Sequence, residues 1–164
     1  MISFNIPAVK DFMAKLLAST FFDHLILKEM EINTFTSFRV SGQFYKEFYT
    51  EEEIGLRKYP AVLWGEIREI AFTIIKGSKS PLSMKIVLQL PPDQTREFLQ
   101  EIPGVNEDDV GGLFINIRFE KEKLDIITGN SMTTFTMDKT LDREWDAKVK
   151  EFFKINKIPI EENY

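Results

Sequence analysis

The fold class of this chain is decided by LFINIRF at residues 113–119, LDIIT at 124–128 and MTTFTM at 132–137. Apolar and polar residues alternate through these segments, the period-two pattern of strands with one face in a core. The charged tetrad EKEK between the first two segments favours a solvated turn. The Gly-Asn pair at 129–130 favours a tight hairpin, because both residue types tolerate positive φ. We therefore predict three consecutive antiparallel strands.

Upstream of this stretch, strand patterns alternate with helix patterns. Residues 7–19 and 62–76 each place apolar side chains on one side at three- and four-residue spacing, which predicts two main helices. Thr50 and Glu53 have the spacing of a capping box and predict a short helix that starts there. Further strands are predicted over residues 2–6, 24–33, 34–41 and 84–90, and a short helix over 92–102.

The C-terminal part of the chain predicts one more helix, over residues 140–155. Its apolar stripe consists of Leu141, Trp145, Val149 and Phe152. The complete pattern predicts an α+β fold: a mainly antiparallel, twisted sheet with two main helices on one face, plus a C-terminal helix. We expect a single domain over residues 1–164, with a core at 1–137, the C-terminal helix at 138–157 and a tail at 158–164.

Composition excludes several classes of protein. The chain has 164 residues, of which 43% are hydrophobic and 29% charged, and a net charge of −5, which is a globular composition. It contains no cysteine, so disulfides, thiolate metal sites and cysteine nucleophiles are excluded. The first residues lack the basic and apolar regions of a signal peptide, and no apolar run approaches the ~20 residues of a membrane span. We therefore expect a cytoplasmic protein without a membrane partner.

Candidate catalytic groups are few. His24 is the only histidine, so a catalytic triad or a histidine-rich metal site would need it; the alternative is a structural histidine at the start of a strand. The densest carboxylate sets are at residues 51–53 and 107–109. Both stand where helix starts favour acids, and neither has the spacing of a calcium loop. From these patterns we assign no catalytic residue, metal site or cofactor.

One set of basic residues predicts an anion or nucleic-acid patch. Lys76, Lys79 and Lys85 lie within ten residues of one another, and Arg68 precedes them by two turns on the same predicted helix. A helix and the segment after it would present these cations together, as phosphate binding requires. The alternative is a solvated face with favourable charge at a helix C-terminus.

A second set, of aromatic residues, predicts a partner-binding surface. Phe44, Tyr45, Phe48 and Tyr49 fall within six residues, in a segment whose pattern is open between a strand and an irregular structure. Clustered aromatic side chains bind partners or stack on bases when they are exposed. The alternatives are burial in the core or at a contact between subunits.

The order of the predicted elements resembles one domain of a DNA sliding clamp. In that family each domain begins with a short strand, here MISFNI at residues 1–6, followed directly by a helix. A second helix corresponds to residues 63–76 and a closing hairpin to 124–137, so the resemblance covers residues 1–137. It implies a ring-forming protein that contacts nucleic acid. The chain departs from the family in having one such domain, two additional helices and few cations on the helices that would line a DNA channel, so we transfer no functional residue.

The whole chain is also similar to an uncharacterised family of proteins from clostridial-type bacteria. The segments that show this similarity are WGEIR at residues 64–68, KGSKSP at 76–81 and EWD at 144–146. The similarity implies a bacterial source and no particular function.

These observations leave three functions open. The leading hypothesis is a non-enzymatic binding or scaffold module that associates with itself through sheet edges and contacts nucleic acid or a protein partner. A second hypothesis is a small enzyme that uses carboxylates, with or without His24. The third is a small-molecule binder with an aromatic-lined cleft.

Overall fold

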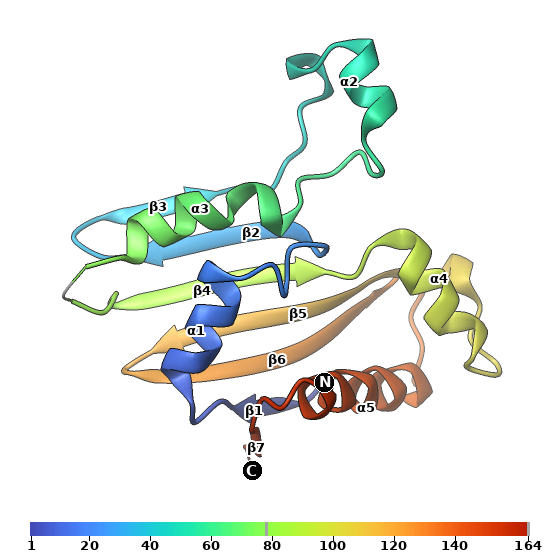
Figure 1. Cartoon of the computed structure of the whole chain (residues 1–164). Helices are drawn as coiled ribbons and strands as arrows, with labels where there is room; N and C mark the ends of the chain where they lie inside the picture. Colours follow the sequence, from blue (N-terminus) through green and yellow to red (C-terminus); the bar gives the residue numbers. More distant parts are fainter. Residues whose placement is uncertain (78, 164) are drawn as a thin grey trace.

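The computed structural model describes residues 1–77 and 79–163. Over these residues seven strands form one antiparallel sheet in the order β3-β2-β4-β5-β6-β1-β7 (Figure 1). The strands are β1 (Ser3–Asn5), β2 (Ile26–Asn33), β3 (Ser37–Val40), β4 (Ser83–Gln89), β5 (Val110–Glu120), β6 (Lys123–Met132) and β7 (Glu161–Glu162). The predicted α+β class with a mainly antiparallel sheet is confirmed.

Three long helices cover one face of this sheet, and no helix of the described residues covers the other. The α-helices of the described residues are α1 (Val9–Ala18), α2 (Glu51–Leu56), α3 (Trp64–Ile75), α4 (Pro92–Gln100) and α5 (Thr140–Ile155), and two short 3₁₀ turns are η1 (Lys46–Phe48) and η2 (Glu107–Asp109). Figure 1 shows α1, α3 and α5 on the same side of the strands, while α4 lies at one end of the sheet. The alternation of β4 follows this division, because Met84, Ile86 and Leu88 are buried beneath the helices and Lys85 is exposed on the opposite face.

The predicted C-terminal helix is part of the core. Phe153 of α5 is fully buried, and its ring lies edge-on to Phe4 of β1 with centroids 5.6 Å apart. It also lies 6.2 Å from the ring of Phe12 on α1. One aromatic side chain therefore joins the sheet to two helices. The buried stripe of α5 is Leu141, Trp145, Val149 and Phe153, so Phe153 takes the place predicted for Phe152, which is half-buried.

The prediction of a third strand in the stretch at 113–137 is wrong. The chain does turn within the charged tetrad, where Lys121 and Glu122 adopt φ of 53° and 63°, as a tight hairpin turn requires. It does not turn again at Gly129, which pairs with Phe114 in the middle of the β5–β6 ladder. The physical reason is length: β5 has 11 residues, and β6 stays extended to Met132 in order to pair along it.

The prediction of a C-terminal tail at residues 158–164 is also wrong for the part that the structure describes, which excludes Tyr164. Lys157 has a φ of 59°, which turns the chain back after α5. Ile158 is then buried in the core, and its amide donates to the carbonyl of Phe153 at 2.9 Å. Residues of β7 pair with β1, so the end of the chain covers that edge of the sheet, whereas β3 forms the other edge.

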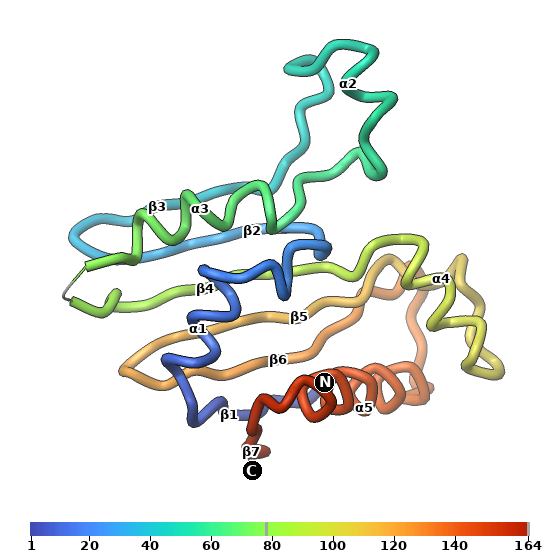
Figure 2. The backbone as a smooth tube through the Cα atoms, in the orientation of Figure 1, coloured from blue at the N-terminus to red at the C-terminus, as the bar shows by residue number. Residues whose placement is uncertain are grey.

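Residues 43–62, which we name the arm, project from the body of the protein (Figures 1 and 2). The capping box predicted for its helix is present: the Glu53 amide donates to the Thr50 hydroxyl, and the Thr50 amide donates to the Glu53 carboxylate. The residues that precede it form the 3₁₀ turn η1, not a strand. The arm leaves the sheet after β3 and returns to it at the start of α3, so both of its ends are anchored.

Candidate functional site

A cleft of about 290 Å³ opens between α4, α5 and the turn before β2. Its floor and walls are mostly apolar, and charged groups stand around its mouth. The lining residues are His24, Leu25, Leu90, Gln94, Glu97, Phe98, Glu101, Ile115, Trp145, Lys148, Val149 and Phe152.

The walls of the cleft are aromatic because two amphipathic helices meet there. Trp145, Val149 and Phe152 follow one another at helical spacing along α5. Phe98 of α4 lies edge-on to Trp145, with ring centroids 5.7 Å apart. The Trp145 indole N–H donates to the carbonyl of Phe114 at 3.1 Å, which fixes the ring against the sheet. These contacts hold the apolar interior of the cleft in one arrangement.

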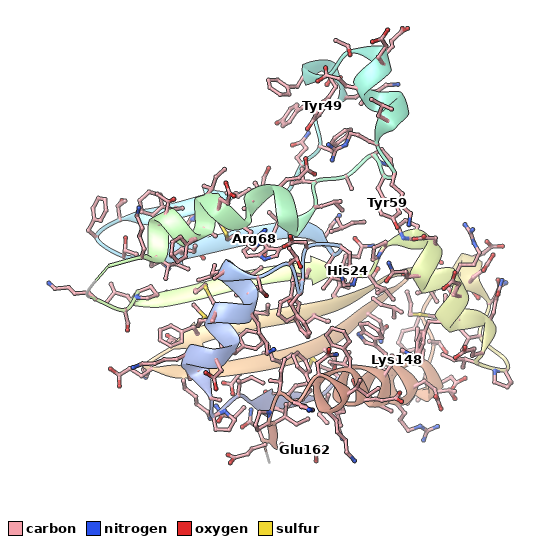
Figure 3. All side chains as sticks on the ribbon, viewed as in Figure 1. His24, Tyr49, Tyr59, Arg68, Lys148 and Glu162 are labelled. Atoms are coloured by element: carbon pink, nitrogen blue, oxygen red, sulfur yellow. The ribbon has the colours of Figure 1, made fainter. Side chains whose placement is uncertain are left out.

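Both signs of charge stand at the mouth of the cleft. Glu97 lies on α4 and Glu101 is the residue that caps the C-terminus of this helix, while Lys148 lies on α5. All three are exposed, and within the described residues none of them has an ion-pair partner within 4.0 Å. Figure 3 shows Lys148 on the side of α5 toward α4, and His24 beside the end of β4. A small molecule bound in the cleft would therefore be near one cation, two anions and an imidazole.

His24 is held toward its neutral form. Partial burial at the cleft lowers the pKa of the imidazole below its ordinary value of 6.5, and the negative charge of Asp23 opposes this shift only in part. At neutral pH the ring is therefore a hydrogen-bond donor and acceptor rather than a cation. Since the unfolded chain binds the proton more readily, the contribution of the neutral His24 ring to stability is complete well above pH 6.5 and is lost as the pH falls from there toward the lower pKa of the folded state.

Because the chain has a single histidine, proton NMR tests this directly. We expect the His24 ring signals to titrate with a midpoint below 6.5. Asp23→Asn should move the midpoint further down, since it removes the charge that favours imidazolium. A midpoint at or above 6.5 in the unaltered protein would contradict the environment described here.

The four cations predicted to form one patch lie in different places. Arg68 makes two hydrogen bonds to the Asp23 carboxylate, at 2.8 and 3.1 Å. Lys85 is on the open face of the sheet, with its ammonium 2.7 Å from the Glu29 carboxylate. Lys76 and Lys79 are exposed together at the end of α3. Arg68 and Lys85 thus each have a carboxylate partner, and Lys76 and Lys79 follow each other at the end of α3. Anion or nucleic-acid binding by the set stays a prediction.

The aromatic set lies on the arm and divides into two pairs. Phe44 and Tyr49 stack with centroids 5.3 Å apart, and the Arg57 guanidinium lies 5.1 and 5.0 Å from their ring centres. Tyr45 and Phe48 are exposed to solvent. One pair thus builds the arm, and the other is available on its surface; partner binding by the set stays a prediction.

The two acidic clusters start helical turns. Residues 51–53 begin α2, and residues 107–109 form η2, where the Asn106 side chain accepts from the Asp108 amide. Over residues 1–77 and 79–163 no group of three histidine, cysteine or acidic side chains has an arrangement that could hold a metal ion. In the same part of the chain, no helix is both long enough and apolar enough to cross a bilayer.

The amino-acid sequence indicates the aromatic residues that line the cleft but not the cleft itself. Trp145 and Phe152 are identified as one helix stripe, and Phe98 as part of another, because each helix has its own periodicity. Nothing in the sequence shows that the two helices face each other across a gap. Glu97, Glu101 and Lys148 have the ordinary spacing of solvent-exposed charges, so no sequence signal identifies them.

The fold and the cleft define a two-layer α+β protein with one helix-covered sheet face and an aromatic cleft at the end of the sheet. The chain belongs to a family of unknown function, DUF5721, whose model matches residues 15–161. Neither a curated protein nor a solved structure matches the chain. The resemblances to a sliding clamp and to clostridial proteins stay predictions.

Proposed function

We propose that this protein is a non-enzymatic binding module whose cleft takes a small molecule with an apolar, ring-sized body and charged groups of both signs. The observation that supports this most directly is the coincidence of aromatic walls with unpaired charges at one mouth. Ligand sites typically combine a mostly apolar concave surface with a few placed polar groups.

The size of the cleft favours a ligand of about the size of an aromatic amino acid. Its volume of about 290 Å³ lies at the lower limit of known ligand pockets, which is roughly 300 Å³. A planar ring would contact Phe98, Trp145 and Phe152 and exclude water from them. Larger cofactors such as dinucleotides exceed this volume.

The charges at the mouth favour a zwitterion. An ammonium group would meet Glu97 and Glu101, and a carboxylate would meet Lys148. The neutral His24 ring could donate to or accept from either group without repelling it. A ligand with a single charge would leave either Lys148 or the two glutamates at the mouth without a partner.

Calorimetry with three related probes tests the proposal. We expect phenylalanine to bind more tightly than either phenethylamine or 3-phenylpropionate, because each of these lacks one charged group. Lys148→Gln should weaken binding of phenylalanine and of 3-phenylpropionate by roughly tenfold, equivalent to about 1.5 kcal/mol for a hydrogen bond to a charged group, and leave phenethylamine unaffected.

The matched control is Arg143→Gln, which removes a cation from an exposed position of α5 outside the cleft. It should bind all three probes as the unaltered protein does. The proposal fails if none of the probes binds, or if Lys148→Gln and Arg143→Gln behave alike.

The enzyme hypothesis is favoured by one observation on the same cleft: His24 lines it together with Glu97 and Glu101. A neutral imidazole beside carboxylates is a combination used in acid–base chemistry. Recovery of a bound probe unchanged after long incubation supports the binding module. Conversion of the probe that is lost in His24→Gln supports the enzyme instead.

A further inference from the structure

The arm exposes apolar side chains within an acidic surface. Phe48 and Leu56 are 83% and 88% exposed, and Tyr45 is 58% exposed. Side chains of this size are ordinarily covered when they occur together in a rigid segment. The arm carries four glutamates, Glu47, Glu51, Glu52 and Glu53, and three cations. Two of these cations, Arg57 and Lys58, pair with carboxylates outside the arm, Glu66 and Asp93, so Lys46 alone stands against the four glutamates.

The arm is held firmly in this position. The Arg57 guanidinium lies against the stacked rings of Phe44 and Tyr49, and it also makes two hydrogen bonds to the Glu66 carboxylate of α3, at 3.0 and 2.6 Å. At the base of the arm the Tyr59 hydroxyl donates to Asp93 of α4 at 2.7 Å. An arm fixed to two helices presents its apolar residues without an entropic cost of ordering them, which favours binding.

The opposite end of the molecule has the complementary character. The arm joins the C-terminal end of β3 to the N-terminal end of α3. The turn between β2 and β3 and the segment that follows α3 lie at the opposite ends of β3 and α3 (Figure 1). There Phe35 and Leu82 are 91% and 73% exposed, and Lys76 and Lys79 are exposed near them. The neighbouring β5–β6 turn adds two acids and two bases, which cancel. We name this surface the basic end.

We propose that copies of this chain associate head to tail, with the arm of one copy docked on the basic end of the next. Two arms would repel each other, because each has a surplus of acidic residues, and two basic ends would repel for the converse reason. Contact between unlike ends pairs glutamates with lysines and covers the exposed phenylalanines and leucines on both sides. The occupant of each surface is therefore a second copy of the same chain.

A contact between two different surfaces is heterologous, so each bound copy still offers one free arm and one free basic end. Such contacts produce a closed ring or an open filament, not a closed two-fold dimer. The self-association predicted from the sequence runs through sheet edges; the contact proposed here uses surfaces at opposite ends of β3 and α3 instead. The cleft takes no part in it, so the proposal is independent of the function proposed above.

Two variants that block opposite surfaces test this assembly. The arm variant combines Phe48→Ser with Leu56→Ser, and the end variant combines Lys76→Glu with Lys79→Glu; all four positions are exposed, so the fold is retained. By sedimentation velocity we expect the unaltered protein to grow beyond a monomer as its concentration rises. Each variant alone should associate at least tenfold more weakly, and the self-association should weaken as salt is raised.

Mixing the two variants provides the decisive measurement. The end variant retains its arm and the arm variant retains its basic end, so an equimolar mixture should form a one-to-one dimer and stop there. Phe135→Ser, an exposed aromatic change outside both surfaces, should assemble as the unaltered protein does. A monomeric unaltered protein, a mixture that stays monomeric, or variants that assemble normally would each overturn the proposal.

Discussion

Replacing Phe153 by alanine is expected to lower the free energy of unfolding by about 3–5 kcal/mol. The side chain is fully buried and contacts the rings of Phe4 and Phe12, so its removal leaves a cavity that the sheet and two helices must share. Urea denaturation followed by tryptophan fluorescence measures this change, since Trp64 and Trp145 are both buried in the folded state. A loss of this size would confirm α5 as part of the core.

The matched control is the same substitution at Phe135, whose side chain is 92% exposed. Phe135→Ala should change the free energy of unfolding by less than about 0.5 kcal/mol, as is usual at an exposed site. If Phe153→Ala were equally mild, α5 would be an appendage to a sheet with two helices, as the element order of the sequence implied. Faster hydrogen exchange confined to α5 in Phe153→Ala, with exchange in the sheet unchanged, would also mean that α5 is an appendage.

The elements with a strong hydrophobic period could be predicted from the sequence. α1, α3 and α5 bury one stripe each, and β4 buries every second residue, so the periodicity that identifies them is the same property that packs them. The capping box at Thr50 was predictable for a related reason, since all of its partners lie within four residues.

The hairpin at Gly129 could not be excluded from the sequence, because local turn preference competes there with a long-range contact. Gly-Asn pairs turn readily, but the β5–β6 ladder extends past this point to a pairing of Val110 with Met132. The Asn130 side chain also donates to the Asp142 carboxylate of α5 at 2.6 Å, and this hydrogen bond stabilises the extended conformation of β6. Phe114 and Asp142, which make these contacts, are more than ten residues away in sequence, so the turn preference of the Gly-Asn pair does not predict them.

The short strand β7 could not be predicted from the sequence either, because contacts with a distant part of the chain hold it in place. Two glutamates in a row favour a solvated tail. Burial of Ile158 and the amide of Asn163 donating to the carbonyl of Ser3 at 3.0 Å hold the segment against β1 instead. The cleft was unpredictable on similar grounds, since it exists between helices and not within either one.

Replacing Gly42, at the base of the arm, by alanine is expected to destabilise the fold. Its φ is 71°, a left-handed conformation that costs an L-residue about 1–2 kcal/mol. A Cβ placed there would lie 2.4 and 2.5 Å from the carbonyl oxygens of Lys28 and Leu27, which belong to the β2 backbone and cannot move freely. We expect Gly42→Ala to lower the free energy of unfolding by more than the conformational cost alone, and to increase amide exchange in the arm and in the first residues of β2.

Gly55→Ala is the matched control, because it makes the same chemical change within the arm that Gly42 precedes, with the opposite expected sign. Gly55 lies within α2, and a Cβ there would meet no atom within 4 Å of it among the described residues. Alanine should stabilise that helix by about 0.5–1 kcal/mol, since glycine loses more conformational freedom on folding. If the two substitutions changed the free energy of unfolding equally, Gly42 would not adopt the left-handed conformation described here. The turn at Gly42 would then not explain the direction in which the arm leaves the sheet.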